Sequence, residues 1–301
     1  MDCNENKLRY IATLNQNYFS TTRRYFELKN PNKTWVVKEY NINPNSLPNS
    51  YKEYFSKCFV KEFYVMKSLK DKLPIVKVES IEKEEDEEYE YPIVYIKMED
   101  FQQGDLKNWR KTFPGISAKI LAELGLQMIN IVQKVHENGY LHRDIKPDNF
   151  FLDSELRLVI ADFENCIEKD SEEISAEFDL DINHYHIGSI YFRPPDLDKN
   201  YGTEWDIFSL GITLYHLLEG EFPYDPISNK LEDVLAELSK LQEEGLSLKS
   251  KKFDQMELDK DLVNFFECFI NKCITCKEKR VKSENLGNFV EKVKILLIKK
   301  K

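Results

Sequence analysis

The first third of this sequence contains no glycine, since the ten glycines of the 301-residue chain begin at Gly104. A glycine-rich turn, which exploits the residue's free access to left-handed backbone, is therefore excluded from that part. Long apolar runs are also lacking, and none approaches the ~20 residues that span a membrane. The N-terminus, with Asp2, Asn4 and Glu5, lacks the basic and apolar regions of a signal peptide. We therefore expect a cytoplasmic protein without a membrane span.

The chain also lacks a basic excess, because 43 Lys and Arg face 53 Asp and Glu, a net charge of −10. This argues against nucleic-acid binding, which needs a basic surface, and leaves basic partners open. Six scattered cysteines do not form a disulfide framework in a chain of this length. Cys273 and Cys276 form one C-x-x-C pair, for which two positions on a packed helix are favoured over a zinc or redox site. The oligomeric state is left open.

Residue patterns divide the chain into a strand-rich first third and a helix-rich remainder, with the joint near residues 99–104. Aromatic and β-branched residues over 8–40 predict strands, with a hairpin turn at Asn30-Pro31-Asn32. Seven acids within 82–90 predict a solvated loop, which we favour over a docking role. Two further strands are expected over 91–98 and 156–161.

Apolar residues at helical spacing predict the helices. A helix is expected over 51–70, with one apolar stripe of Phe55, Phe59, Phe63, Met66 and Leu69. A second buried face contains Leu121, Leu124, Met128, Ile131 and Val135, and Asn138-Gly139 caps its C-terminus. The remaining helices are expected over 204–219 (closed by Gly220), 231–243, 261–273 and 284–298.

The segment from Tyr140 to Phe151 follows that capped helix and contains an Asp, a Lys and an Asn within six positions. Such spacing between apolar anchors is typical of a rigid loop that presents polar side chains together. It resembles the catalytic loop of the eukaryotic-type protein kinases, whose pattern is H-R-D-x-x-x-x-N, because His142, Arg143, Asp144 and Asn149 match it position by position. The resemblance implies an α+β, bilobal protein kinase fold, with a β-rich N-lobe over 1–99 and an α-helical C-lobe over 100–301.

The resemblance also implies catalytic roles. Asp144 would be the base that accepts the proton of the substrate hydroxyl, and Lys146 would neutralise the γ-phosphate. Lys38, in Trp35-Val36-Val37-Lys38, resembles the lysine that holds the α- and β-phosphates, with Glu62 as its ion-pair partner and Glu53 as the rival. Asn149 and Asp162 would bind Mg²⁺. Asp162-Phe163-Glu164 stands where the family has Asp-Phe-Gly, and the substituted glycine is expected to restrict movement of this segment.

The glycine-rich nucleotide loop of the family is replaced by Leu14-Asn15-Gln16-Asn17-Tyr18-Phe19-Ser20. Asn tolerates left-handed backbone, so a turn can form, but its side chain would crowd the phosphates. We expect weakened or altered ATP binding. The ATP contacts that the resemblance implies are Asn15, Asn17, Phe19, Ser20, Val36, Lys38, Met98, Glu99, Phe101, Asp105, Phe151 and Ala161.

Further segments resemble the family's structural motifs. Gly188–Asp196 resembles G-T-x-x-Y-R-A-P-E, in which the hydroxyl of Ser189 would bridge Asp144 and Lys146, and Asp196 would pair with Arg280. Asp206 would cap the backbone of the catalytic loop.

Residues 164–181 contain eight acids and one base, Lys169. The acids either replace an activating phosphate by pairing with Arg143, or favour a basic substrate, or belong to a mobile solvated loop. Ser171 and Ser175 are weaker candidates for phosphorylation.

These residues predict an ATP- and Mg²⁺-dependent Ser/Thr protein kinase that acts on protein hydroxyls, because a lysine two positions after the catalytic Asp resembles Ser/Thr kinases. The alternative is a pseudokinase that regulates a partner, which the missing glycines and Glu164 favour. A third interpretation keeps the fold and changes the acceptor to a small molecule or the reaction to nucleotidyl transfer. Lys146 and the segment 188–196 count against it.

Overall fold

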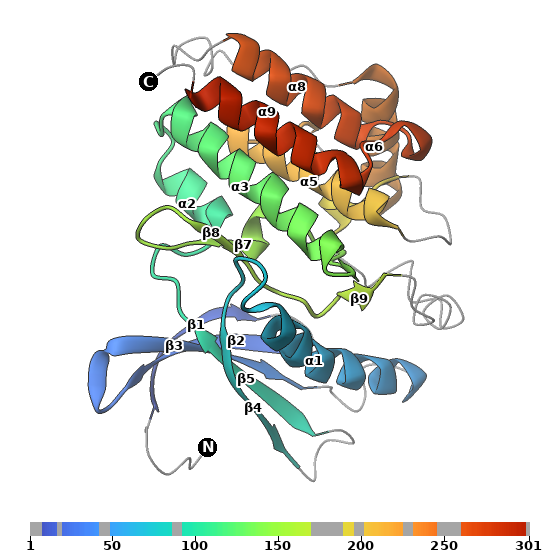
Figure 1. Ribbon diagram of the computed structural model, residues 1–301. Coiled ribbons are helices and arrows are strands. Elements are labelled where there is room, and N and C mark those ends of the chain that lie inside the picture. Colours follow the sequence, from blue (N-terminus) through green and yellow to red (C-terminus); the bar gives the residue numbers. More distant parts are fainter. Residues whose placement is uncertain are drawn as a thin grey trace. The chain divides into compact units, whose positions relative to one another are not determined.

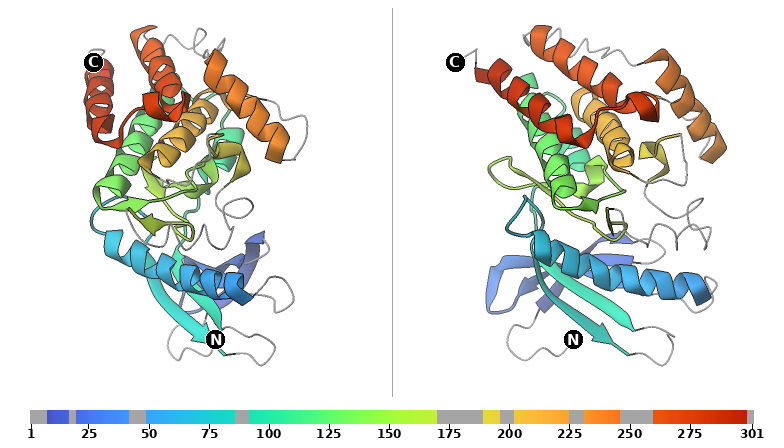
Figure 2. Two further views of the ribbon diagram at one scale, coloured as in Figure 1. Left: turned by 90° about the vertical axis from the view of Figure 1, so that its right-hand side faces the viewer. Right: turned by 45° about the vertical axis from the view of Figure 1, so that its right-hand side comes forward.

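The computed structural model describes residues 8–16, 20–41, 49–85, 92–169, 189–195, 202–224, 231–245 and 260–298. The chain forms two compact units, one comprising residues 1–71 and 75–102 and the other comprising 72–74 and 103–301. Figures 1 and 2 show the sheet and single long helix of the first unit and the helices of the second. Within the described ranges, no helix is long and apolar enough to cross a membrane.

The first unit is built on a five-stranded antiparallel sheet with the order β1-β2-β3-β5-β4. Its strands are β1 (Leu8–Gln16), β2 (Ser20–Glu27), β3 (Asn30–Tyr40), β4 (Val78–Glu84) and β5 (Ile93–Glu99). Helix α1 (Asn49–Leu69) packs against β4 and β5 (Figure 1). The predicted apolar stripe of this helix is confirmed, since all five of its members are buried.

The predicted hairpin turn at residues 30–32 is wrong by two positions. The chain turns at Leu28 and Lys29, and Asn30 already pairs with Glu27. The next pair in the ladder is Phe26 with Thr34, so residues 31–33 of β3 form an irregularity between these two pairs. Pro31 is tolerated there because its missing N–H would only be needed in a regular ladder.

The acidic loop predicted over 82–90 also begins later than expected. Strand β4 extends to Glu84, and Glu82 and Glu84 pair with Tyr95 and Ile93 of β5. This strand lies at an edge of the sheet, where charged side chains reach water without leaving the ladder. Residues 86–90 lie outside the described ranges.

The second unit is mainly helical and carries short strands beside its loops. Its helices are α2 (Leu106–Thr112), α3 (Ala118–Glu137), α5 (Thr203–Glu219), α6 (Leu231–Glu244), α8 (Lys260–Ile274) and α9 (Leu286–Ile298). Its strands are β6 (Tyr140–Leu141), β7 (Phe150–Leu152), β8 (Leu158–Ile160) and β9 (Ile167–Glu168), which the sequence pattern predicted only in part. They form two antiparallel pairs, β6 with β9 and β7 with β8.

Helix α5 is the centre of this unit and is buried from Trp205 to Glu219. It packs against α3 and α8, and α3 also packs against α9. The predicted caps are confirmed: Asn138 ends α3, and Gly139 and Gly220 adopt left-handed backbone with φ of 83° and 78°. The Asn138-Gly139 turn leads directly into β6 and so starts the loop with the candidate site residues.

Candidate functional site

In the first unit, Lys38 and Glu62 form a buried ion pair. Lys38 Nζ lies 3.5 Å from Glu62 Oε1, and the two side chains are 11% and 1% exposed. Glu62 lies on the buried face of α1, and Lys38 lies near the end of β3. The structure thus gives Glu62 as a partner of Lys38, while the side chain of its rival, Glu53, lies outside the described part of the chain.

Tyr40 also contacts this ion pair, although none of the sequence motifs named it. Its hydroxyl donates a hydrogen bond to Glu62 Oε2, and Lys38 Nζ lies 4.7 Å from the centroid of its ring. Residues two apart on a strand share a face of the sheet. This period was the available signal, since Tyr40 follows Lys38 by two positions on β3.

The other predicted nucleotide contacts of the first unit are partly described. Val36 and Met98 are cross-strand partners, each 8% exposed, and Ser20 is buried opposite Tyr40. Glu99 and Phe101 are half-buried. Glu99 and Phe101 flank Asp100 in the chain, and the carboxylate of Asp100 accepts two hydrogen bonds from Arg24 at 2.9 and 3.1 Å.

Asn15 does not adopt the left-handed backbone that Asn tolerates and that a turn at this position would need. It lies in extended β1, pairs with Thr22 and is exposed. Asn17 and Phe19 lie outside the described ranges. The expectation that the Asn-containing loop weakens nucleotide binding stays a prediction.

In the second unit, the carboxylate of Asp144 is buried and fixed by its neighbours. Oδ2 accepts from Lys146 Nζ at 2.6 Å and from Asn149 Nδ2 at 3.0 Å, and Oδ1 accepts from the backbone N–H of Ser189 at 2.8 Å. Asn149 Nδ2 also donates to the Asp144 carbonyl at 2.8 Å, which closes the loop on itself. The structure therefore brings three predicted residues together at one carboxylate.

Ser189 contacts both Asp144 and Lys146, but differently from the expectation. Its hydroxyl accepts from Lys146 Nζ at 3.2 Å, whereas its backbone amide, and not its hydroxyl, supplies the bond to Asp144. Any residue except proline could supply this amide contact. The contribution specific to the Ser189 side chain is therefore its hydrogen bond with Lys146. Gly188, Asp196, Ser171 and Ser175 lie outside the described ranges.

The charge of Lys146 is set by the acids around it. Burial would lower its pKa, but the charges of Asp144 and Asp162 raise it above the usual value. Lys146 is therefore a firmly protonated ammonium beside two carboxylates. Asp162 adopts left-handed backbone with φ of 66°, a conformation that Asp tolerates better than most residues.

Glu164, which stands where the resemblance expects glycine, does not adopt left-handed backbone. Among the described residues other than glycine, positive φ occurs at Arg143, Leu156 and Asp162. The glutamate is therefore accommodated without the strain that its side chain would suffer in the left-handed region. Phe163 is fully buried and packs edge-on against His142, with ring centroids 4.6 Å apart.

Asp206 supports the catalytic loop from α5, as the resemblance implied. Its carboxylate accepts the backbone N–H groups of His142 and Arg143, both at 2.7 Å, and lies 2.9 Å from His136 Nε2. Burial would raise the pKa of Asp206, but the hydrogen bond and charge of His136 and the interactions with His142 lower it. Asp206 thus stays ionised and holds the left-handed backbone of Arg143, whose φ is 64°.

The side chains of the same loop are also fixed. His142 is fully buried, burial lowers its pKa, and its Nε2 lies 3.0 Å from the Ala161 carbonyl oxygen. Arg143 Nε donates to the Asn165 carbonyl at 2.6 Å. Ala161 in turn donates its N–H to the Asn149 carbonyl at 3.0 Å, so the segments on either side of β7 and β8 are linked.

Asp105 has a structural role in addition to the ATP contact that the resemblance implies. It is the N-cap of α2: its Oδ1 accepts from the Asn108 backbone N–H at 2.8 Å and its Oδ2 from Asn108 Nδ2 at 2.7 Å. A capping Asp satisfies an orphan helix donor. Phe151, another predicted nucleotide contact, pairs with Asp105 through a β-bridge and is half-buried.

Arg280 is 3% exposed and is held by backbone oxygens and an aromatic ring. Its Nε donates to the Thr275 carbonyl at 2.9 Å, and its guanidinium lies 5.0 Å from the Phe208 ring centroid. Its predicted partner, Asp196, lies outside the described ranges.

The oxygen donors of Asn149 and Asp162 suit Mg²⁺, which binds one or two carboxylates together with substrate phosphates and water. Because Asn149 Nδ2 donates to Asp144, the amide oxygen is the end of that side chain that can ligate a metal. In the described part of the chain, no cluster of three or more His, Cys, Asp or Glu residues forms a metal site made of protein ligands alone. Asn149 and Asp162 thus supply oxygen ligands of the kind that Mg²⁺ accepts beside phosphate oxygens.

The antiparallel sheet with its Lys–Glu pair, followed by a helical unit with the Asp144 loop, defines the two-lobed α+β fold of protein kinases. A family model for the protein kinase domain matches residues 19–291, and the chain belongs to this family.

Curated relatives are serine/threonine-protein kinases. PKH2 of Candida albicans is 27% identical over 50% of this chain and 16% of its own length. Genghis Khan of Drosophila melanogaster is 32% identical over 44% of this chain and 8% of its own length. MRCK beta of Rattus norvegicus is 28% identical over 68% of this chain and 11% of its own length. The chain thus spans less than a fifth of the length of these relatives.

Proposed function

We propose that this chain is an ATP- and Mg²⁺-dependent Ser/Thr protein kinase, with an N-lobe over residues 1–99 and a C-lobe over 100–301. The observation that carries the proposal is the carboxylate of Asp144, which is held by Lys146, Asn149 and the Ser189 amide. Phosphoryl transfer requires positioning and neutralised charge more than covalent chemistry from the protein. A fixed carboxylate beside a protonated lysine meets both requirements.

Each residue has one task in this proposal. Asp144 orients the substrate hydroxyl and accepts its proton as the oxygen bonds to the γ-phosphorus of ATP and ADP departs. Lys146 neutralises the transferred phosphoryl group, and Lys38, steadied by Glu62, holds the α- and β-phosphates. Asn149 and Asp162 would hold Mg²⁺, which would neutralise phosphate charge.

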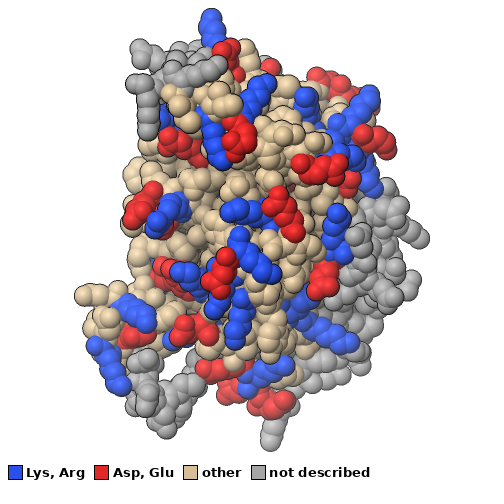
Figure 3. Space-filling model, viewed as in Figure 1, with Lys and Arg blue, Asp and Glu red and all other residues tan. Residues whose placement is uncertain are grey.

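The choice of acceptor rests on Lys146 and on the relatives, whose names describe serine/threonine-protein kinases. A protein substrate with basic residues fits the net charge of −10. Lys and Arg are interspersed with Asp and Glu on the face drawn in Figure 3, where the described residues form no continuous basic surface. This supports a protein substrate over nucleic acid, and a cytoplasmic location is part of the same proposal.

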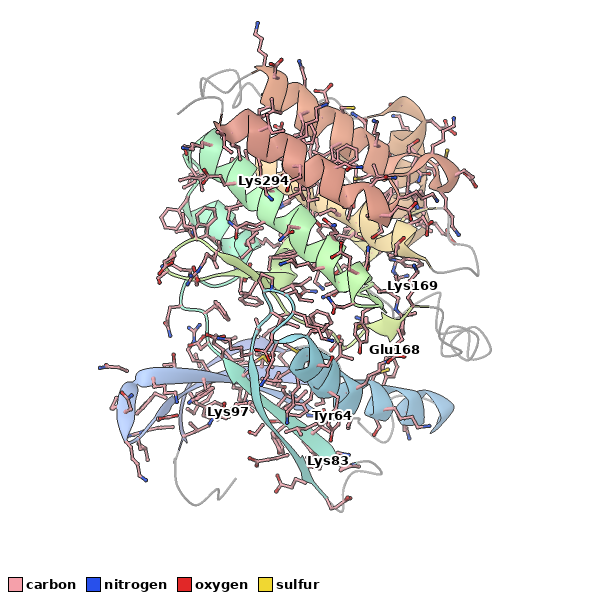
Figure 4. The ribbon with its side chains drawn as sticks, in the orientation of Figure 1. Tyr64, Lys83, Lys97, Glu168, Lys169 and Lys294 are labelled. Atoms are coloured by element: carbon pink, nitrogen blue, oxygen red, sulfur yellow. The ribbon has the colours of Figure 1, made fainter. Side chains whose placement is uncertain are left out.

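The test is transfer of labelled γ-phosphate to the chain itself and to basic proteins such as histone and myelin basic protein. We expect incorporation as phosphoserine or phosphothreonine, and loss of at least a hundredfold in Asp144→Asn, because a positioned base contributes about 10²–10⁴-fold. Glu291→Gln is the matched control, since it removes an exposed carboxylate of α9 in the same unit, the ion-pair partner of the Lys294 labelled in Figure 4.

Transfer that persists in Asp144→Asn would refute the assignment of the base. Absence of transfer in the wild type would favour the regulatory, pseudokinase alternative. A thermal-shift titration with ATP and Mg²⁺ then separates a nucleotide-binding regulator from a scaffold that binds none.

A further inference from the structure

Tyr40 contacts both partners of the Lys38–Glu62 pair. Its hydroxyl donates to Glu62 Oε2, whereas Lys38 approaches the other carboxylate oxygen. The Lys38 ammonium lies over the face of the Tyr40 ring, 4.7 Å from its centroid. A cation in this position is attracted by the ring's negative face.

The same ring is anchored to α1. Tyr40 stacks on Phe59, with centroids 4.1 Å apart and planes 10° from parallel. Phe59 and Glu62 are three positions apart on α1 and therefore neighbours on one helix face. Tyr40 thus contacts α1 at two adjacent points, through its ring and through its hydroxyl.

The buried carboxylate of Glu62 requires a hydrogen-bond donor in addition to the charge of Lys38. Its side chain is 1% exposed, and a buried carboxylate is costly unless it is both paired and hydrogen-bonded. The Lys38 contact of 3.5 Å is longer than the 2.7–2.9 Å typical of a charge-assisted hydrogen bond. The lysine therefore supplies charge to Glu62, while the hydroxyl of Tyr40 supplies a directional bond that fixes the orientation of the carboxylate.

We propose that Tyr40 is a positioning residue that aligns Glu62 and Lys38 for binding the phosphates of the nucleotide. The proposal rests on the proposed kinase function for its consequence, but its geometry lies within the first unit. Tyr40 is fully buried and does not act on substrate itself. Its hydroxyl sets the carboxylate, and its ring supports the ammonium.

The experiment is a double-mutant cycle between Tyr40→Phe and Glu62→Gln. The phenylalanine retains the ring, its stacking on Phe59 and its contact with Lys38, and removes only the hydroxyl. Tyr95→Phe is the matched control, because it also removes a tyrosine hydroxyl that is hydrogen-bonded to a glutamate, Glu84. Tyr95 pairs across the strands with Glu39, whose side chain lies on the opposite face of the sheet from that of Lys38. For each variant, the Kd of Mg-ADP, the KM for ATP and the free energy of unfolding are measured.

We expect Tyr40→Phe to weaken Mg-ADP binding and to raise the KM for ATP on the order of tenfold, the equivalent of one charge-assisted hydrogen bond. Tyr95→Phe should leave both constants unchanged. In the Glu62→Gln background, Tyr40→Phe should change both by less than about twofold, since coupled residues are not additive. A purely structural role would instead lower kcat through the folded fraction and leave KM unchanged.

Unchanged constants in Tyr40→Phe, a loss that persists undiminished in Glu62→Gln, or an equal loss in Tyr95→Phe would each overturn the proposal. If the wild type binds Mg-ADP but transfers no phosphate, the proposed kinase activity fails, and the binding cycle still decides the role of Tyr40. If it binds no nucleotide, hydrogen exchange of the α1 amides around Glu62 decides. Faster exchange in Tyr40→Phe than in Tyr95→Phe supports anchoring of α1, and equal exchange refutes it.

Discussion

Replacement of Asp206 by asparagine tests how strongly α5 holds the catalytic loop. The carboxylate is fully buried and receives the N–H groups of His142 and Arg143 at 2.7 Å, with His136 Nε2 at 2.9 Å. Asparagine retains the volume and one acceptor oxygen but turns an NH₂ group toward one of these donors. A buried donor left without a partner costs about 1–3 kcal/mol, and loss of the charge weakens the remaining bonds.

We therefore expect Asp206→Asn to lower the free energy of unfolding by about 3–5 kcal/mol, the range found when one member of a buried charged network is removed. Urea denaturation followed by tryptophan fluorescence measures this at pH 7. Asp153→Asn is the matched control, because Asp153 also accepts two backbone N–H groups, of Glu155 and Arg157, but in an exposed loop where water can replace it.

The difference in free energy of unfolding between the wild type and Asp206→Asn should depend on pH with a definite sign. The pKa of Asp206 is lowered in the folded chain, so its contribution to stability is present above the unfolded-state pKa and is lost as pH falls through the folded value. The stability difference between wild type and Asp206→Asn should therefore be constant at neutral pH and narrow in acid, below about pH 4. A loss under about 1 kcal/mol, or a loss equal to that of Asp153→Asn, would refute the reasoning.

Three further predictions concern the second unit. Gly211→Ala should lower the free energy of unfolding by about 1–3 kcal/mol in urea titrations, because its Cβ would lie 2.7 Å from Cys273 Cβ inside the α5–α8 contact. Burial lowers the pKa of His216 to about 4, so the unfolded chain binds the proton first, and stability should fall as pH decreases from about 6.5 toward 4. His216→Phe should reduce that slope in thermal melts between these pH values, and an unchanged slope would contradict the assignment. Asp105→Ala should cost about 1 kcal/mol through loss of the α2 cap, and a KM for ATP equal to wild type would show that capping is its whole role.

The sequence predicted the elements of the fold well where one period dominated. The stripe from Phe55 to Leu69 and the cap at Asn138-Gly139 needed only helical spacing and the left-handed freedom of glycine. The sequence pattern gave the wrong position for the hairpin turn, which was expected at residues 30–32. The pairing register of β2 and β3 decides this position and places the turn at residues 28–29.

For the candidate site, the motif of the catalytic loop was sufficient to name Asp144, Lys146 and Asn149. It was not sufficient to show which atoms meet, as the backbone amide of Ser189 illustrates. Tyr40 was missed altogether, because its importance depends on α1, whose Phe59 and Glu62 follow it by 19 and 22 positions in the chain.

The sequence by itself determined the family, the strand-to-helix order and the residue types at the site, because these depend on local periodicity and short motifs. Only the tertiary structure decided that Asp105 caps a helix, that Asp206 fixes two backbone amides and that Tyr40 holds Glu62. Hydrogen bonds and ion pairs between distant segments are set by packing geometry at the scale of ångströms. A linear pattern of residue types does not contain that geometry.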